Sequence, residues 1–159
     1  VPSRTAREIA VETVERLANE VREVVAIKEA GGSLDRVSEL VQHCPRIAIL
    51  SGDDSLTLPM MVVGARGVIS VAANFMPKDV ADMTSAALAG DFARAREMHL
   101  RMFPVFKACF IETNPIPCKT AMEMMRLCRG DLRLPLSPML TANRERLARA
   151  LRAYGLLKA

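Results

Sequence analysis

The sequence predicts an α/β fold in which a parallel sheet covered by helices is followed by an all-helical region. Three short apolar runs, at 24–28, 47–51 and 67–71, are each followed by an amphipathic segment. Continuous apolar strands that alternate with such helices are typical of a parallel sheet buried on both faces. Beyond residue 90 only helical spacing of apolar residues remains, so we expect two regions, 1–90 and 91–159.

The bulk composition is that of a globular protein. The chain has 159 residues, 50% hydrophobic and 25% charged, with a net charge of +4. This length allows one domain with a real core, and the mild basic excess suits anionic small substrates as well as nucleic acid. The longest uncharged runs are far shorter than a membrane span, so we expect no membrane association.

The metal-binding residue types are few and scattered. The two histidines, His43 and His99, are far apart in sequence and have no acidic neighbours at ligand spacing, so no metal site is expected. The cysteines show no C-x-x-C spacing and stand in apolar or helical contexts, which favours free buried thiols in a reducing cytoplasm. These are Cys44, Cys109, Cys118 and Cys128.

The first half of the chain alternates helices and strands. Residues 1–5 are expected to be extended because Val1 precedes a proline, and an amphipathic helix follows around 11–21. Val24–Lys28 reads as a buried strand. Ser33 is a candidate N-cap for a helix over Leu34–His43. The later expected elements are a strand at 47–51, a helix ending near Gly64 with Pro59 in its first turns, a strand at 67–71, and a helix at 78–89.

The second half reads as helices only. Asp91 can cap a long helix through Phe106, which contains Pro104 and ends before the loop at 114–117. Two further helices are expected at about 118–127 and at Asn143–Tyr154, the last one closed by Gly155. The methionines at helical spacing in this region indicate core or subunit interface.

The expected strands would carry their polar residues to one edge. Right-handed crossovers place the carboxyl ends of parallel strands on the same side, where α/β folds carry their active sites. This gathers Lys28, Gly52, Ile69 and Ser70 at one mouth. Lys28 would share a strand face with small apolar residues, and an apolar setting lowers the pKa of a lysine and makes its amine nucleophilic. The alternative is a strand-end lysine that reaches solvent.

The acidic pair Asp53-Asp54 directly follows the second expected strand. Catalytic carboxylates or a magnesium site are one interpretation. An N-cap for the next helix is the other, and it is the one we favour because acidic side chains satisfy free backbone N–H groups at helix starts.

Several stretches, taken together in order, match one enzyme family. The chain resembles dihydrodipicolinate synthases, within the class I aldolase superfamily that includes N-acetylneuraminate lyase. The resemblance covers essentially the whole chain. The matching segments are Val-Pro-Ser-Arg-Thr at 1–5, Ile-Lys-Glu-Ala at 27–30, Leu-Ser-Gly-Asp-Asp at 50–54, Gly-Val-Ile-Ser-Val at 67–71, Asn-Pro-Ile-Pro-Cys-Lys at 114–119 and Leu-Arg-Leu-Pro-Leu-Ser-Pro at 132–138.

This resemblance implies a (β/α)8 (TIM) barrel followed by an all-helical C-terminal region. Such barrels need about 250 residues. The chain would hold only the end of the fifth strand, strands six to eight with the eighth helix, and the C-terminal helices. We therefore expect an N-terminal half of the barrel outside this sequence, because half a barrel exposes two strand edges. The family also implies a cytoplasmic homodimer or homotetramer.

The resemblance also implies the chemistry. Lys28 matches the lysine that forms a Schiff base with pyruvate, which then condenses with aspartate semialdehyde to give 4-hydroxy-tetrahydrodipicolinate in lysine and diaminopimelate biosynthesis. Arg4 matches the arginine that binds a substrate carboxylate. Gly52 and Ile69 match positions whose backbone lies against the active site. No cofactor and no metal is implied.

The departures from the family pattern concern the proton relay. The relay tyrosine should lie two residues before Val1, and the threonine pair, a second tyrosine from the neighbouring subunit and the lysine inhibition site also map upstream. Ala6 stands where a glycine is common, and Gly31-Gly32 varies the usual Thr-Gly. We therefore expect little or no turnover from the isolated chain.

Two alternatives remain open at this point. Another pyruvate-dependent class I aldolase, of the N-acetylneuraminate lyase or keto-deoxy sugar acid type, would share the Schiff base and differ in the aldehyde acceptor. A nucleic-acid-binding module would use the basic last helix, although its apolar face indicates a docked surface helix. The basic residues concerned are Arg144, Arg146, Arg149 and Arg152.

Overall fold

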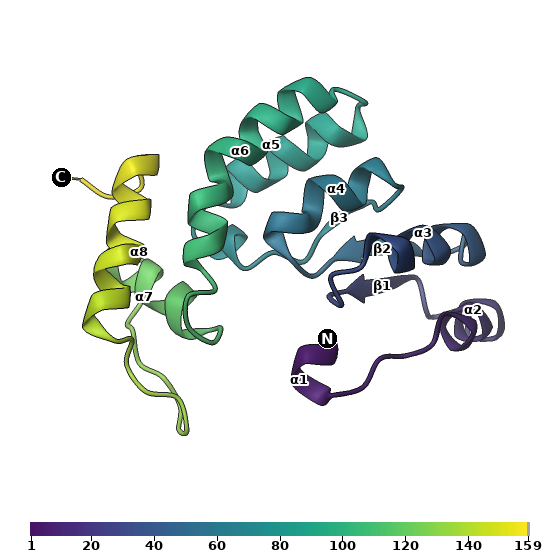
Figure 1. The fold of residues 1–159 in the computed structure, drawn as a ribbon, viewed down its shortest axis with the longest axis horizontal. Coiled ribbons are helices and arrows are strands. Elements are labelled where there is room, and N and C mark those ends of the chain that lie inside the picture. The colour runs from purple at the N-terminus through teal and green to yellow at the C-terminus, as the bar shows by residue number, and fades with distance from the viewer. Residues whose placement is uncertain (159) are drawn as a thin grey trace.

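The computed structural model describes residues 1–158 and contains a three-stranded parallel sheet with helices around it (Figure 1). The strands are β1 Ala26–Glu29, β2 Ala48–Ser51 and β3 Gly67–Val68, in the spatial order β1-β2-β3. Both pairings are parallel, with Lys28 opposite Leu50. The predicted parallel α/β arrangement is therefore confirmed for this part of the fold.

The helices alternate with the strands up to β3 and then continue alone. Two short 3₁₀ helices, η1 Asp54–Leu56 and η2 Ala72–Asn74, follow β2 and β3. The α-helices are α1 Pro2–Thr5, α2 Val11–Glu20, α3 Leu34–His43, α4 Thr57–Val62, α5 Pro77–Leu88, α6 Phe92–Ala108, α7 Ile116–Met124 and α8 Thr141–Tyr154.

The helix starts chosen from capping residues are confirmed. Ser33 accepts a hydrogen bond from the backbone N–H of Arg36 at the start of α3, and Asp91 accepts one from Arg94 at the start of α6. The backbone N–H groups in the first turn of a helix have no acceptor within the helix, and these two side chains supply one. Helices α7 and α8 each begin two residues earlier than expected, and the early start of α7 suits its prolines, since the first turn needs no N–H donors.

The amino-terminal part departs from the sequence-based expectation in two places. Residues 2–5 form α1 instead of an extended segment, with Pro2 at the first helical position, where its fixed φ is favourable. The first strand spans Ala26–Glu29 instead of Val24–Lys28. The guanidinium of Arg46 donates a hydrogen bond to the carbonyl of Val24 at 3.1 Å. That carbonyl is therefore bonded to a side chain and not to the neighbouring strand.

The third strand is shorter than the apolar run at 67–71 indicated. Its ladder ends with the backbone N–H of Ile69, which donates to Ser51 at 2.8 Å. Two residues further on, the backbone N–H of Val71 donates instead to the carboxylate of Asp54 at 2.9 Å. A side-chain acceptor from the neighbouring connection therefore ends the strand.

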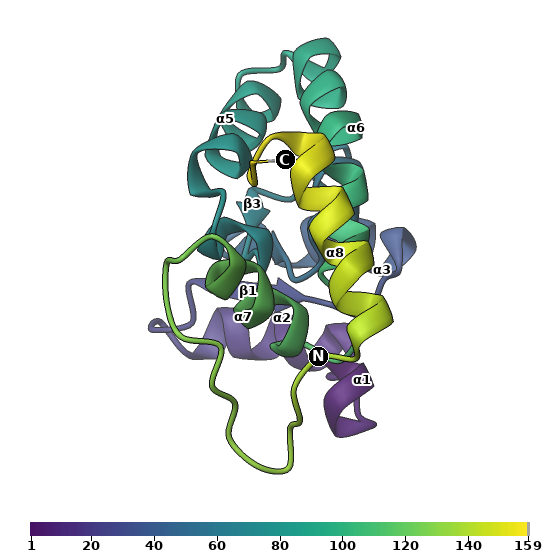
Figure 2. The same ribbon diagram turned by 90° about the vertical axis from the view of Figure 1, so that its left-hand side faces the viewer.

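The later helices pack on α4 and on each other. Helices α5 and α6 pack side by side above β3 and α4, and α8 packs on α6 and α7 (Figures 1 and 2). The apolar face of α8 is buried through Leu147, Ala148 and Leu151, while its arginines are exposed. This confirms α8 as a docked surface helix. The largest fully buried apolar side chains of the core are Phe106, Leu40, Met60, Met76, Met83, Met102, Leu147 and Leu151.

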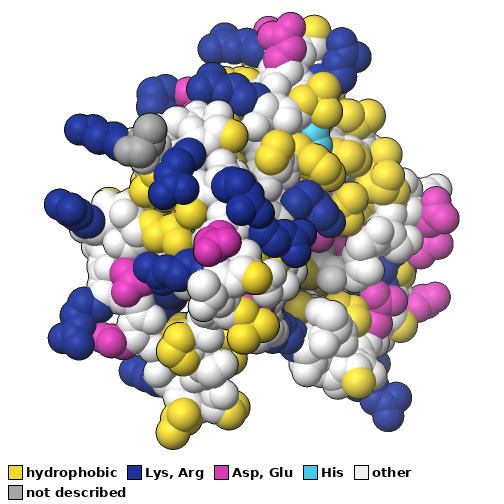
Figure 3. Space-filling model, turned by 60° about the vertical axis from the view of Figure 1, so that its left-hand side comes forward, with side chains coloured by type: hydrophobic (Ala, Val, Ile, Leu, Met, Phe, Trp, Pro, Cys, Tyr) yellow, Lys and Arg dark blue, Asp and Glu magenta, His cyan; other side chains and the backbone are white. Residues whose placement is uncertain are grey.

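Apolar surface remains open in this part of the chain. Within residues 1–158, β1 and β3 each have one edge without a partner strand. Large apolar side chains on α6, including Leu100 and Phe103, are exposed, and Figure 3 shows hydrophobic side chains gathered on one face. Among the same residues, no helix combines the length and the apolar character that crossing a membrane requires.

Candidate functional site

Lys28 is the third residue of β1 and lies at the carboxyl half of the strand, as expected. Alternation along the strand sends its side chain to the face opposite that of Glu29. The side chain is exposed, as is Ala26 on the same face. The largely apolar setting that the sequence suggested for this lysine is therefore not found in the part of the chain that the structure describes.

Gly52 is brought directly against Lys28. Its backbone N–H donates to the carbonyl of Glu29 at 2.7 Å, which extends the β1–β2 ladder by one residue. A β-carbon on Gly52 would lie 2.8 Å from Cε of Lys28 and 2.5 Å from Cβ of Ala30. Only glycine allows the backbone after β2 to approach the lysine side chain this closely.

Ile69 and Ser70 complete the edge on the third strand. The backbone of Ile69 is bonded to Ser51, and its side chain is 47% exposed. The expectation that Lys28, Gly52 and Ile69 lie at the ends of three neighbouring strands is confirmed. Ser70, in contrast, turns its hydroxyl away to the carboxylate of Asp54.

Arg4 reaches the same side of the molecule from α1. Its guanidinium donates from Nη1 to Oγ1 of Thr113 at 3.0 Å and from Nη2 to the carbonyl of Asn114 at 3.1 Å. These residues belong to the loop before α7, which lies with α1 on the side toward which the strands point (Figures 1 and 2). Arg4 is thus placed by a long-range contact that no local sequence pattern indicates.

The acidic pair after β2 has two separate structural roles. Asp53 accepts from the backbone N–H of Ser55 and caps η1, as the preferred interpretation predicted. Asp54 is buried and accepts from the Ser70 hydroxyl and from the N–H groups of Val71 and Ala72. Burial raises the pKa of this carboxyl above its usual value, and the three hydrogen bonds oppose the shift. Within residues 1–158, no cluster of three His, Cys, Asp or Glu side chains forms a metal site.

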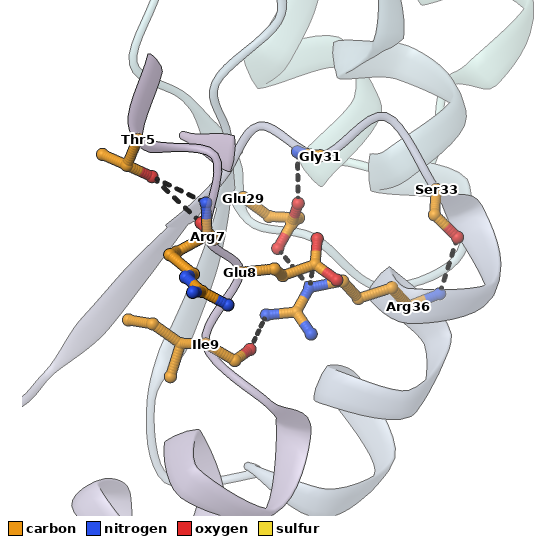
Figure 4. Close-up of polar contacts among 8 residues, drawn as sticks. All are labelled: Thr5, Arg7, Glu8, Ile9, Glu29, Gly31, Ser33 and Arg36. Carbon is orange, nitrogen blue, oxygen red and sulfur yellow. Dashed lines mark hydrogen bonds and ion pairs between the residues drawn. The ribbon is translucent and has the colours of Figure 1, made fainter. Parts of the chain in front are cut away.

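A buried ion pair lies next to Lys28, and the sequence patterns did not predict it. The carboxylate of Glu29 contacts Nε of Arg36 at 2.8 Å (Figure 4). Strand alternation places Glu29 on the same face as Ile27. A charged residue at this inward position is the one feature of the sequence that indicates a buried ion pair. Its partner could not be identified, because the pairing depends on how α3 packs.

The cysteines differ from each other in burial. Cys44, Cys109 and Cys118 are buried, as expected, but Cys128 is exposed in the segment after α7. The expectation of buried thiols is therefore wrong for Cys128, whose segment leaves the helix packing. Burial raises the pKa of the Cys118 thiol to about 11, with a smaller contribution from the charge of Asp54.

Comparisons with known proteins match one family over nearly the whole chain. The model of the dihydrodipicolinate synthetase family matches residues 1–154. The chain is 49% identical over 157 residues to the 4-hydroxy-tetrahydrodipicolinate synthase of Hydrogenobaculum sp., covering 99% of this chain and 54% of that protein. It is 55% identical over 152 residues to that of Thermomicrobium roseum, covering 95% and 50%.

Comparison with solved structures leads to the same family. The crystal structure of dihydrodipicolinate synthase from Aquifex aeolicus superposes with a TM-score of 0.97 at 51% identity, covering 100% of this chain and 55% of that one. The chain spans about half the length of the curated relatives that it matches. On these matches of sequence and structure, this chain belongs to the dihydrodipicolinate synthetase family.

Proposed function

We propose that this chain acts as the carboxyl-terminal half of a 4-hydroxy-tetrahydrodipicolinate synthase that condenses pyruvate with aspartate semialdehyde. The observation that supports this most directly is the contact between Lys28 and Gly52 at the carboxyl edge of a parallel sheet, in a chain 49% identical over 157 residues to a protein of that name. Active sites of parallel α/β barrels lie at this edge.

The proposed protein is a complete (β/α)8 barrel in the cytoplasm, working in lysine and diaminopimelate biosynthesis. Residues 1–90 contribute the last part of the barrel, from the end of strand five to helix eight. Residues 91–159 form the helical C-terminal region; the last of them, Ala159, lies outside the described residues. The unpaired edges of β1 and β3 and the exposed apolar side chains support pairing with an N-terminal half, and subunits would assemble as homodimers or homotetramers.

In this function Lys28 is the nucleophile. Its amine attacks the C2 carbonyl carbon of pyruvate, and the carbonyl oxygen leaves as water, which gives a protonated imine. The imine draws electrons from the methyl group, so loss of a methyl proton gives an enamine whose terminal carbon forms the new bond to the aldehyde carbon. The contact with Gly52 leaves the Lys28 amine free of a bulky neighbour on that side.

The other site residues have binding and shaping roles. Arg4 would bind a substrate carboxylate, since a guanidinium fork matches the two oxygens geometrically. Thr113 and the Asn114 carbonyl, from the loop before α7, hold that side chain in place. Gly52 and Ile69 would present backbone to the substrate.

Reductive trapping tests the nucleophile. The full-length protein containing this chain is incubated with pyruvate and borohydride, which delivers a hydride to the imine carbon and makes the adduct permanent. We expect one pyruvyl adduct, located at Lys28 by peptide mass mapping, and none in Lys28→Ala. An adduct at another lysine, or no adduct, contradicts the proposal.

A coupled assay separates the proposal from other aldolases. With aspartate semialdehyde as acceptor and dihydrodipicolinate reductase as the coupling enzyme, we expect turnover that depends on both substrates. A protein that traps pyruvate at Lys28 but accepts only N-acetylmannosamine or another sugar aldehyde would be a different class I aldolase.

A further inference from the structure

Glu29 follows Lys28 in β1 and carries a charge into the interior. Its side chain is only 4% exposed, whereas the Lys28 side chain points to the opposite, open face. A carboxylate loses strong hydration on burial and remains there only when charged or hydrogen-bonding partners replace the water. The partners of Glu29 therefore hold the end of β1 in addition to its ladder bonds to β2.

Both carboxylate oxygens of Glu29 are occupied. Oε2 accepts from Nε of Arg36 at 2.8 Å, and Oε1 accepts from the backbone N–H of Gly31 at 2.5 Å (Figure 4). Arg36 lies in the first turn of α3, whose start is capped by Ser33. The carboxylate thus joins the end of β1, the turn that follows it and the start of α3.

Arg36 extends this connection to the amino-terminal segment. Its Nη2 donates to the carbonyl of Ile9 at 2.6 Å, and its Nε lies 3.5 Å from Oε1 of Glu8 (Figure 4). Residues 6–10, which join α1 to α2, are exposed and bury no side chain that could hold them. Arg36 is therefore a principal anchor of the segment that begins directly after Arg4 and Thr5.

We propose that Glu29 is a positioning residue: through its bonds to Arg36 and Gly31 it holds the end of β1 that carries Lys28 and, through Arg36, the segment 6–10 that directly follows the helix carrying Arg4. The inference rests on the proposed function, because it assigns Lys28 and Arg4 to one active site. Glu29 does not face the substrate side of the strand and takes no part in the chemistry itself.

Glu29→Gln tests the role of the carboxylate. The amide has the same shape but only one oxygen, so it cannot accept from both Arg36 and Gly31, and its NH₂ group meets a donor. We expect the rate of borohydride-trappable imine formation at Lys28, per folded molecule, to fall on the order of 10- to 100-fold, as small displacements of reacting groups do. Glu20→Gln is the matched control, because it removes an exposed ion pair with Arg16.

Arg36→Lys tests the connection to Arg4 separately. Lysine keeps the charge next to Glu29 but lacks the fork that reaches Ile9 at the same time. Taking Arg4 as the residue that binds the carboxylate of aspartate semialdehyde, we expect imine formation at Lys28 to change by no more than about 2-fold. KM for aspartate semialdehyde should rise on the order of 10-fold, because residues 6–10, which follow Arg4, lose the bond from Arg36 to Ile9. A residue with a purely structural role would not divide the two effects in this way.

The outcomes are distinguishable. If the unchanged protein traps no pyruvate at Lys28, the proposed function fails. If it traps pyruvate normally and both variants match it in imine formation and KM per folded molecule, while melting at lower temperature, Glu29 is only structural and the inference is wrong. If Glu29→Gln does not fold, Arg36→Lys decides by the KM shift alone: its absence overturns the inference, and its presence supports it.

Discussion

Gly52 lies so close to Lys28 that a single added methyl group would collide with the lysine side chain, at 2.8 Å from its Cε. The same methyl group would meet Cβ of Ala30, which cannot move without moving β1. The backbone after β2 and the candidate nucleophile on β1 are therefore shaped against each other.

Replacing Gly52 with alanine should displace the nucleophile. We expect Gly52→Ala to lose about 1–3 kcal/mol of stability through overpacking and to slow imine formation at Lys28 by about 10-fold or more. Urea denaturation and pyruvate–borohydride trapping measure the two effects. Gly90→Ala is the matched control: it adds a methyl group in open space at a φ of 81°, so it should cost about 1–2 kcal/mol without slowing the trapping.

The bonds of Asp54 predict a graded loss of stability. Asp54→Ala leaves the half-buried N–H group of Val71 and the buried one of Ala72 without an acceptor, so we expect a loss of about 2–4 kcal/mol in the free energy of unfolding. Asp54→Asn keeps one oxygen for these donors and should lose less than half as much. Equal losses for the two variants in urea denaturation would show that these hydrogen bonds are not the cause.

His99 predicts a dependence of stability on pH. Burial lowers the pKa of His99 below its ordinary value of 6.5, and its Nδ1 has no hydrogen-bond partner among the described residues. The unfolded chain takes up a proton near pH 6.5 and the folded chain resists it, so folding should lose stability as the pH falls below that value. The loss stops once the pH is below the folded pKa.

The measurement is the urea midpoint between about pH 7.5 and about pH 5. His99→Phe places a phenyl ring beside Phe103 and Phe106, whose ring centroids lie 5.8 and 6.1 Å from that of His99. This variant should flatten the acid side of the stability profile. His43→Gln serves as the control, because the His43 side chain is 49% exposed. A profile unchanged by His99→Phe would refute this origin of the pH dependence.

The burial of the thiols predicts selective labelling. A thiol reacts as the thiolate, so exposure and a low pKa favour modification. Cys128 is exposed, whereas burial raises the pKa of the Cys44 and Cys109 thiols and that of Cys118 to about 11. Under native conditions, peptide mass mapping after brief treatment with a thiol reagent should find label on Cys128 first. Comparable rates at the four positions would contradict the described burial.

Much of the fold follows from local patterns. Ser33 and Asp91 mark helix starts because their side chains bond the free N–H groups of the first turn, and this chemistry is visible in the sequence. The apolar runs predict the strands because buried strands are continuous in hydrophobicity. Strand ends are less predictable: Val24 and Val71 look like strand residues, but Arg46 and Asp54 take up their backbone groups.

The candidate site divides in the same way. The apolar runs are enough to place Lys28, Gly52 and Ile69 at strand ends, because parallel strands with right-handed crossovers share one carboxyl edge. The pairing of Glu29 with Arg36 and the contact of Arg4 with Thr113 become visible in the folded chain alone. Those contacts join segments distant in the chain, and their partners are selected by packing and burial of charge, which no local pattern encodes.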